Sequence, residues 1–231
     1  MKESIYTIPI NEAFSSECHC PLCSIYEKLE DDLVEASVGA AMMEPDRRIE
    51  TNEKGFCKKH IEQMSLKKQV LPLSLVLQTH IRQQIDTIFN MQSKPRMFSK
   101  GKKETAQKIS QYIDGVKSSC YICNTLEAQM QRYAENIVYM WKKDEQFKSK
   151  FSEKSFCVNH LKLLLDIAVK DLGENHFNTF FDILLKNAKA SYEKSYNDIT
   201  DFVNSFDYRF KGELSQDTKT ATRTVIDKFI Y

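Results

Sequence analysis

The chain of 231 residues is poor in the two residues that most often interrupt regular structure. It contains six glycines and five prolines, too few for the closely spaced turns of a β-sandwich or β-barrel. Its charge is also almost balanced, with 33 Lys and Arg against 32 Asp and Glu. A nearly neutral chain has no strong field toward nucleic acid or an anionic membrane, so we expect neither as a partner.

Other signals of location and chemistry are missing as well. No run of about 18 apolar residues is present, so we expect no transmembrane helix. The first residues, MKESIYTIPINEAF, lack an apolar core, so we expect no signal peptide and a cytoplasmic location. The sequence has no Gly-rich phosphate loop, no G-x-S-x-G and no H-E-x-x-H. The common nucleotide-binding and hydrolytic motifs are therefore excluded.

Long segments rich in Leu, Lys, Glu, Ala and Gln predict an all-α protein. Apolar residues at helical spacing indicate a helix after Cys23 that Pro45 ends, and another that Pro72 begins. A basic segment at 93–103 separates these from a helix at 104–118. Near the C-terminus the same spacing predicts one long helix over 175–211, ended by Gly212, and a final helix over about 217–230.

Cysteine is plentiful, and six of the seven cysteines belong to a repeated pattern. The pattern is C-x2-C, a gap of 33 residues and C-x2-H, and a second copy follows at a shift of 100 residues. A lone C-x2-C is weak, but this recurrence is typical of metal ligands. The eight predicted ligands are Cys20, Cys23, Cys57, His60, Cys120, Cys123, Cys157 and His160.

The two copies also resemble one another between the ligands. Across residues 20–60 and 120–160, ten of 41 aligned positions are identical, namely four ligand pairs and six others. Such self-similarity predicts an internal duplication. We therefore expect two tandem helical repeats, each stapled by a Cys3His zinc site, plus a long C-terminal helix. The predicted boundaries are 1–92 for the first repeat, 93–103 for a basic linker and 104–231 for the second repeat.

The gap of 33 residues is compatible with an outward helix and an extended return. About 20 helical residues cover roughly 30 Å, and the next 11 or so cover roughly 35 Å when extended. Each C-x2-C pair would then share an ion with the C-x2-H pair of its own repeat. We expect each C-x2-H pair to open a helix, where residues i and i+3 lie on one face.

Three thiolates and one imidazole suit a tetrahedral zinc ion, and four protein ligands leave no open position for a catalytic water. We therefore interpret the two sites as structural zinc centres, two ions per chain. An iron–sulfur cluster at the same ligands is the main alternative, because thiolates also select such clusters. Unmetallated thiols and a thioredoxin-like redox pair remain open. Disulfides are disfavoured in a cytoplasmic protein.

Several other residues lie near the motifs without being duplicated. Cys18 and His19 precede the first cysteine pair, but serines stand at 118 and 119, so the shared site does not need them. We interpret Cys18 as an accessory cysteine, with a spare ligand or reactive thiol as the alternative. His80 and His176 are expected to be packing histidines with a hydrogen bond.

Three charged features each allow two interpretations. Glu27 and Glu127 stand four residues after a ligand cysteine and either bind the ligand histidine or simply favour a helix N-terminus, the latter being preferred. The acidic run at 30–32 has no counterpart at 130–132 and is expected to be a solvated face. The basic linker is expected to be a solvated connection rather than a phosphate site.

The segments YTIPINEAF, CPLC, GFCKKH and FCVNHL, together with the second C-x2-C, carry a family resemblance. The chain resembles an uncharacterised family of bacterial proteins, mostly from clostridial anaerobes, with tandem CxxC…CxxH motifs. The resemblance covers essentially the whole chain. It implies a bacterial cytoplasmic protein and implies no reaction.

These observations favour a non-enzymatic zinc-binding protein that acts in interaction or as a scaffold. The long aromatic-rich helix would supply an interface for a protein partner or a homodimer. A redox- or metal-responsive sensor that uses the zinc thiolates is the alternative. Less favoured is an enzyme with a pocket between the repeats, built on His80, His176 or the pair Glu35 and Glu135.

Overall fold

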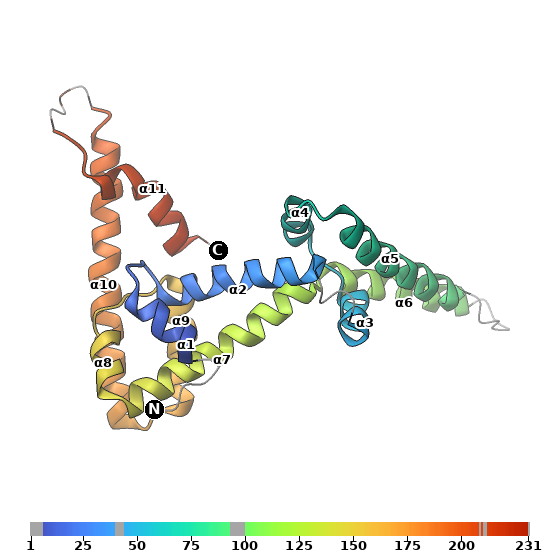
Figure 1. The fold of residues 1–231 in the computed structure, drawn as a ribbon, viewed down its shortest axis with the longest axis horizontal. Coiled ribbons are helices and arrows are strands. Elements are labelled where there is room, and N and C mark those ends of the chain that lie inside the picture. The colour runs from blue at the N-terminus through green and yellow to red at the C-terminus, as the bar shows by residue number, and fades with distance from the viewer. Residues whose placement is uncertain (1–6, 40–43, 93–99, 208, 210–211, 231) are drawn as a thin grey trace. The chain divides into compact units, whose positions relative to one another are not determined.

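The computed structural model describes residues 7–39, 44–92, 100–207, 209 and 212–230. Within these ranges the chain forms eleven helices and no strand, which confirms the all-α prediction (Figure 1). In chain order they are α1 (Thr7–Ser15), α2 (Pro21–Val38), α3 (Pro45–Lys54), α4 (Lys58–Leu66), α5 (Val70–Gln92), α6 (Lys100–Lys117), α7 (Tyr121–Lys143), α8 (Glu145–Phe151), α9 (Val158–Asp171), α10 (Glu174–Asn204) and α11 (Gln216–Phe229).

The helices belong to two compact units. The first unit comprises Met1–Glu27 and Gln129–Tyr231, and the second comprises Lys28–Ala128. The boundaries fall within α2 and within α7, so these units differ from the repeats expected at 1–92 and 104–231. The repeat boundaries describe the duplication of the sequence and stay a prediction.

The segments expected to return as extended chain are partly helical. Pro45 does not end a helix but begins α3, because proline fits the first helical position, where no N–H partner is needed. In the second copy, Asp144 starts α8 by accepting the backbone N–H groups of Gln146 and Phe147 at 2.9 and 3.1 Å. The ten residues of α3 cover about 15 Å, which is less than half the length that ten extended residues cover.

The long C-terminal helix is confirmed but ends earlier than expected. Helix α10 has 31 residues and stops at Asn204 rather than near residue 211. The helix ends there because short polar side chains compete with helical hydrogen bonding for the backbone N–H and C=O groups. Ser205 Oγ donates to the carbonyl of Phe202 at 2.6 Å, and the Asp207 carboxylate accepts the backbone N–H of Arg209 at 2.9 Å. Short polar side chains that bond to nearby backbone groups favour turns over helix.

The first unit has an aromatic core. Phe151 lies 5.0 Å from Phe180 and 5.4 Å from Phe156 between ring centroids, and Trp141 meets Phe180 edge-on at 5.0 Å. Phe14 of α1 adds its ring 4.7 Å from that of Phe147. These rings bring α1, α7, α8 and α10 together around the segment that precedes Cys157.

The core of the second unit is smaller. Val34, Val38, Met64 and Val76 are buried there, and α5 packs against α3, α4 and α6. Phe56 meets Tyr121 edge-on at 6.2 Å, so an apolar contact joins the residue before Cys57 to the residue after Cys120. Each unit thus supports the backbone beside its own cysteine motifs.

Most of the predicted basic linker, residues 93–99, lies outside the described residues. Residues 100–103 belong to the first turn of α6 rather than to a connection. Among the helices that the structure describes, none is both long and apolar enough to cross a membrane.

Candidate metal centres

The structure gathers the eight predicted ligands into two groups, but with exchanged partners. Centre 1 consists of Cys20, Cys23, Cys157 and His160, and centre 2 consists of Cys57, His60, Cys120 and Cys123. In each group the ligand atoms all lie within 4.8 Å of one another. Two Cys3His clusters are therefore present as expected, while the pairing of each C-x2-C with the C-x2-H of its own repeat is wrong.

The exchange has a physical basis. The two copies carry the same ligand types at the same gap, so either pairing completes two Cys3His sets. The pairing within a repeat depends on an extended return, and α3 and α8 replace much of that extended chain by helix. Helices α3 and α8 shorten these segments relative to a fully extended chain, and the groups that form are those of the exchanged pairing.

All four ligand pairs have the same local structure. The first ligand of each pair precedes a helix and its carbonyl accepts the first helical hydrogen bond, at 3.3 Å for Cys20, 3.0 Å for Cys57, 3.0 Å for Cys120 and 2.8 Å for Cys157. The second ligand is the third residue of that helix. Centre 1 is thus built on the N-termini of α2 and α9, and centre 2 on those of α4 and α7.

A helix N-terminus is a favourable place for a thiolate. The aligned peptide dipoles leave partial positive charge there, which stabilises an anion. Each centre faces two such termini at once. The C-x2-C and C-x2-H motifs therefore have the same structural role. Each begins a helix and presents two ligand atoms on one side of it.

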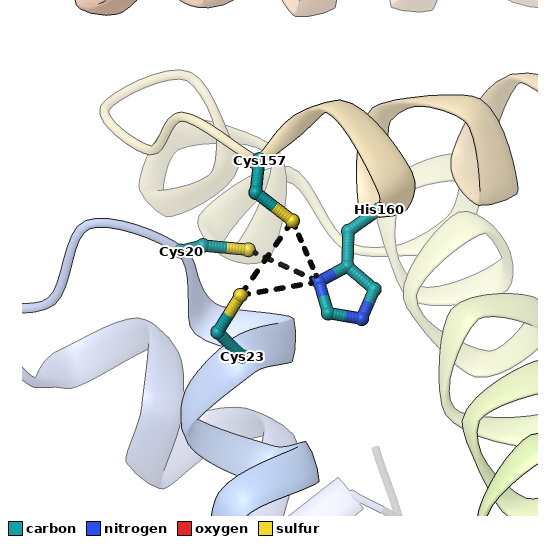
Figure 2. A group of neighbouring side chains, drawn as sticks. All are labelled: Cys20, Cys23, Cys157 and His160. Carbon is teal, nitrogen blue, oxygen red and sulfur yellow. Dashed lines mark hydrogen bonds between the residues drawn. The ribbon is translucent and has the colours of Figure 1, made fainter. Parts of the chain in front are cut away.

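In centre 1 the imidazole Nδ1 of His160 faces the three sulfurs (Figure 2). It lies 3.4 Å from Cys20 Sγ, 3.4 Å from Cys23 Sγ and 3.2 Å from Cys157 Sγ. Cys23 Sγ and Cys157 Sγ are 3.6 Å apart, far beyond the length of a disulfide bond. Cys20 and Cys157 are buried and Cys23 and His160 are half-buried, so the protein covers most of this centre.

In centre 2 the His60 Nδ1 takes the same role. It lies 3.2 Å from Cys57 Sγ, 3.2 Å from Cys120 Sγ and 3.5 Å from Cys123 Sγ. Cys57 Sγ and Cys123 Sγ are 3.9 Å apart. His60 and Cys120 are buried, but Cys123 is exposed, so centre 2 is open to solvent on one side.

Three of the clustered thiols, Cys20, Cys23 and Cys123, have raised pKa values and resist ionisation, whereas hydrogen bonds with Cys20 and Cys23 lower the pKa of Cys157. Burial raises the pKa of the Cys20 thiol to about 12, and the neighbouring Cys157 adds to the effect. Cys123 is exposed as a residue, but partial burial of its sulfur beside the other ligands, with a further contribution from Cys120, raises the pKa of its thiol to about 12. Three thiolates in van der Waals contact repel one another, and a bound metal ion reverses that balance. The donor sets therefore fit a cation far better than they fit an empty thiol cluster.

A carboxylate that the sequence interpretation missed supports centre 2. Glu30 Oε1 lies 3.2 Å from His60 Nε2, and its side chain is 12 % exposed. Burial alone raises the pKa of the Glu30 carboxyl, but hydrogen bonds from Lys59, Gln63 and His60 outweigh it and leave the pKa lowered. A carboxylate on the outer nitrogen holds the ring so that Nδ1 points to the metal.

Glu30 lies in the acidic run that was expected to be a solvated face, so that expectation is wrong for this residue. The alignment of the two copies does not single out Glu30, because Met130 stands at the equivalent position. Glu27 and Glu127, the alternative partners for the ligand histidines, are both exposed. Their exposure agrees with the preferred interpretation of carboxylates near a helix N-terminus.

A comparison with families of related sequences matches residues 1–230 to a family of unknown function, DUF6062. The chain belongs to this family. No curated protein and no solved structure matches the chain. Membership of DUF6062 confirms the resemblance noted in the sequence and brings no activity with it.

In this DUF6062 member, one hydrogen bond to a backbone carbonyl joins the two ligand motifs of each centre. In centre 2 the carbonyl of Gly55 accepts the backbone N–H of Tyr121 at 2.8 Å. At the equivalent position in centre 1, Ser155 Oγ donates to the carbonyl of His19 at 3.2 Å. In both centres the contact is made by the residue two positions before the C-x2-H motif. It is made to the backbone of a residue adjacent to the first cysteine of the C-x2-C motif in the same centre.

The remaining candidates lie apart from the ligands. Cys18 Sγ donates to the carbonyl of Ala13 at 3.6 Å, and neither Cys18 nor His19 belongs to either group of ligands. His80 is a hydrogen-bonded packing histidine as expected, because its Nδ1 donates to the carbonyl of Asn52 at 2.8 Å. His176 is exposed, so the packing interpretation is wrong there.

The carboxylates proposed for a pocket, Glu35 and Glu135, are both exposed. Glu135 accepts a hydrogen bond from Gln131 of its own helix at 2.9 Å, and Glu35 lies 4.0 Å from Lys67. These are ordinary contacts of solvated helix faces. The enzyme hypothesis therefore gains no support from the residues on which it depended.

Proposed function

We propose that the protein is a non-enzymatic helical protein in which two structural zinc ions fix the starts of four helices. The observation that carries this proposal is the closed ligand set of each centre, three sulfurs and one nitrogen turned toward one point. A structural zinc site is filled by four protein ligands, whereas a catalytic site keeps a position for water or substrate.

The separations of the ligand atoms support zinc. A tetrahedral ion with Zn–S of about 2.3 Å and Zn–N of about 2.0 Å places two sulfurs about 3.7 Å apart and a sulfur about 3.5 Å from the nitrogen. One sulfur pair in each centre is close to this separation, at 3.6 Å in centre 1 and 3.9 Å in centre 2, and the sulfur–nitrogen distances run from 3.2 to 3.5 Å. The side chains thus stand where one small tetrahedral ion needs them.

The same distances weigh against an iron–sulfur cluster. In a cluster the cysteines bind different iron atoms, and the cluster's own iron and sulfide atoms separate them. Ligand atoms that all lie within 4.8 Å of one another suit a single ion. Thiolate ligands also need a reducing compartment, and this supports the cytoplasm as the location.

The scaffold or interaction role is proposed from exposed apolar side chains. Toward its C-terminal end α10 exposes Tyr196 at 69 %, and Phe206 just beyond the helix is 77 % exposed. An open apolar groove between α10 and α11 is lined by Tyr192, Ile199 and Phe229 among others. Apolar surface of this kind is typical of protein–protein interfaces, and the partner is a second protein or a second copy of this chain.

Elemental analysis with an absorption spectrum of anaerobically purified protein tests the metal proposal. We expect two zinc ions per chain and no visible absorption. A brown protein that absorbs near about 400 nm contradicts the proposal in favour of clusters. Sedimentation of the same sample, compared with Phe206→Asp, tests the interface: an oligomer that the substitution dissociates supports a homodimer, and an unchanged oligomer contradicts this surface.

A redox sensor is the second candidate, and the exposure of Cys123 favours it. Peroxide can oxidise the thiolates of Cys57 and Cys123, which lie 3.9 Å apart, to a disulfide. Two thiolates lose two electrons, the peroxide takes these with two protons and leaves as two waters, and the metal is released. Zinc release from centre 2 before centre 1, with loss of helicity, supports this function, whereas full retention of zinc and helicity under peroxide contradicts it.

A further inference from the structure

One lysine of the first unit lies in the protein interior. Lys228 of α11 is 8 % exposed, and its Nζ donates to Ser191 Oγ at 2.8 Å and to Ser195 Oγ at 2.9 Å on α10. An ammonium group removed from water is costly unless an anion compensates it. Hydroxyl groups are neutral, and the nearby Asp198 carboxylate is bound by Lys194 at 2.9 Å. Among the described residues no carboxylate pairs directly with Lys228, so a further anion would stabilise the buried charge.

A chain of hydrogen bonds leads from Lys228 to centre 1. Ser191 Oγ accepts from Lys228 at 2.8 Å and from Ser155 Oγ at 3.1 Å. Ser155 also donates to the carbonyl of His19, the residue before Cys20. These contacts join Lys228, through Ser191 and Ser155, to the backbone that precedes the first ligand.

A second contact connects the same helices to the other side of the centre. Tyr192 of α10 donates its hydroxyl to the carbonyl of Phe156, the residue before Cys157, at 3.0 Å. The ring of Tyr192 meets the ring of Phe229 of α11 at 4.8 Å between centroids. Helix α11 also packs on α10 and on α9, which begins with the ligands Cys157 and His160.

The charge of a loaded centre 1 supplies the missing anion. Three thiolates and a neutral imidazole around a divalent ion carry a net charge of −1. Burial lowers the pKa of the Lys228 ammonium, and Lys194 lowers it further, while the charges of Asp198 and Cys20 act in the opposite direction.

We propose that Lys228 is the counter-charge of the metal–thiolate centre 1 and couples the docking of α11 to the metal. The inference rests on the proposed metal occupancy of centre 1. Metal binding creates the anion that stabilises the buried ammonium, and the docked ammonium stabilises the anionic centre. By thermodynamic linkage, metal binding stabilises the docked helix α11 by the same free energy by which the docked helix stabilises metal binding. The C-terminal helix therefore reports whether centre 1 is loaded.

A lysine beside serine hydroxyls also occurs in Ser–Lys hydrolases. Here Ser195 is 2 % exposed and Lys228 is 8 % exposed, while Ser191 is half-buried, so the lysine side chain that would have to act as the base is shielded from a substrate. The groove between α10 and α11 is lined by other side chains of the two helices. The arrangement suits a structural charge and not a nucleophile.

The test uses the full chain with both centres loaded with zinc and compares Lys228→Met with Lys219→Met. Both substitutions remove one positive charge from α11, but Lys219 is exposed. A chelator is added, and hydrogen exchange is followed by mass spectrometry over residues 19–24 and 155–161 for centre 1, and 56–61 and 120–124 for centre 2. Residues 216–229 report the docking of α11.

We expect K228M to speed metal loss from centre 1 by about tenfold or more, the usual effect of removing a group that supports metal ligands. Centre 2 should be unchanged, and K219M should match the unmodified chain at both centres. A buried methionine packs well without a charge, so α11 of K228M should stay protected after the metal leaves. In the unmodified chain α11 should lose protection together with centre 1.

Two results would overturn this inference and leave the proposed function intact. One is that metal leaves centre 1 equally fast in K228M and K219M. The other is that the protection of α11 in the unmodified chain does not change when the metal is removed. If K228M does not fold, Ser191→Ala tests the same link, because it interrupts the chain to Ser155 and keeps the charge. It should also loosen centre 1, and an unchanged centre 1 contradicts the inference. An unmodified chain without metal at centre 1 overturns both this inference and the proposed function.

Discussion

Substitution of Gly55 by alanine should damage centre 2 without touching any ligand. Gly55 follows α3, has φ 62 and donates its N–H to the carbonyl of Thr51 at 2.9 Å. Its own carbonyl accepts the N–H of Tyr121 at 2.8 Å. Its ψ is −159, so it lies in a backbone region that essentially only glycine adopts, and a residue with a Cβ there costs about 1–3 kcal/mol.

A steric term adds to the backbone strain. A Cβ on residue 55 would lie 2.5 Å from His80 Cε1 and 2.6 Å from His80 Nε2. The ring is held by Asn52 and by Gln84, which contacts Nε2 at 2.5 Å. The ring must move and weaken these contacts, and overpacking of this kind costs about 1–3 kcal/mol. Together the backbone strain and the overpacking predict a loss of about 2–6 kcal/mol in the unfolding free energy of the second unit.

The assay is urea unfolding followed by circular dichroism, with hydrogen exchange over residues 51–60 to localise the effect. Gly115→Ala is the matched control in the same unit, because nothing lies within 4 Å of a Cβ at that position. As a glycine inside α6, it should gain about 0.5–1 kcal/mol on substitution. The double variant with His80→Ala removes the clash and leaves the strain of φ.

The result that refutes this reasoning is specific. A loss below about 1 kcal/mol in G55A contradicts the strained backbone at residue 55. An equal loss in G55A whether residue 80 is histidine or alanine contradicts the steric term. In the latter case the ring of His80 does not restrain the turn before Cys57.

Three further predictions concern other positions. Glu30→Gln should weaken metal binding at centre 2 about tenfold or more, measured by chelator competition; Glu27→Gln, at an exposed glutamate, is the control, and equal effects of the two would contradict the role of Glu30. Phe156→Ala should destabilise the first unit by about 3–5 kcal/mol, because this ring is 1 % exposed; the fluorescence of Trp141 reports that unit, and an unshifted transition would refute it. Cys18→Ser should retain both metal ions by elemental analysis, and loss of one ion would show that Cys18 is a ligand.

Much of the fold could be predicted because helices leave a strong periodic signal. The final helix, expected at about 217–230, is α11 at Gln216–Phe229. The eight residues of the two clusters could be predicted because Cys and His at fixed spacings, repeated within one chain, are typical of metal sites. Helix ends were less predictable, as at Asn204, because they depend on single hydrogen bonds from short polar side chains.

The pairing of the half-motifs could not be predicted from spacing. Both pairings use identical ligands, and only the path of the intervening chain distinguishes them. The supporting residues were hidden for a different reason. Glu30 stands in an acidic run that looks solvated, and Lys228 resembles an ordinary surface lysine in the sequence. One signal was present for Lys228, since it continues the apolar stripe of Ala221 and Val225 at helical spacing.

The central claim is the exchanged pairing, and ion counting by native mass spectrometry tests it most directly. One variant replaces Cys20, Cys23, Cys157 and His160 by alanine, and a second replaces Cys20, Cys23, Cys57 and His60. With exchanged pairing the first variant loses one complete centre and keeps the other, so one metal ion per chain should remain. The second variant leaves two ligands in each centre and should hold no tightly bound ion. The opposite outcome, no ion in the first variant and one in the second, would contradict the account.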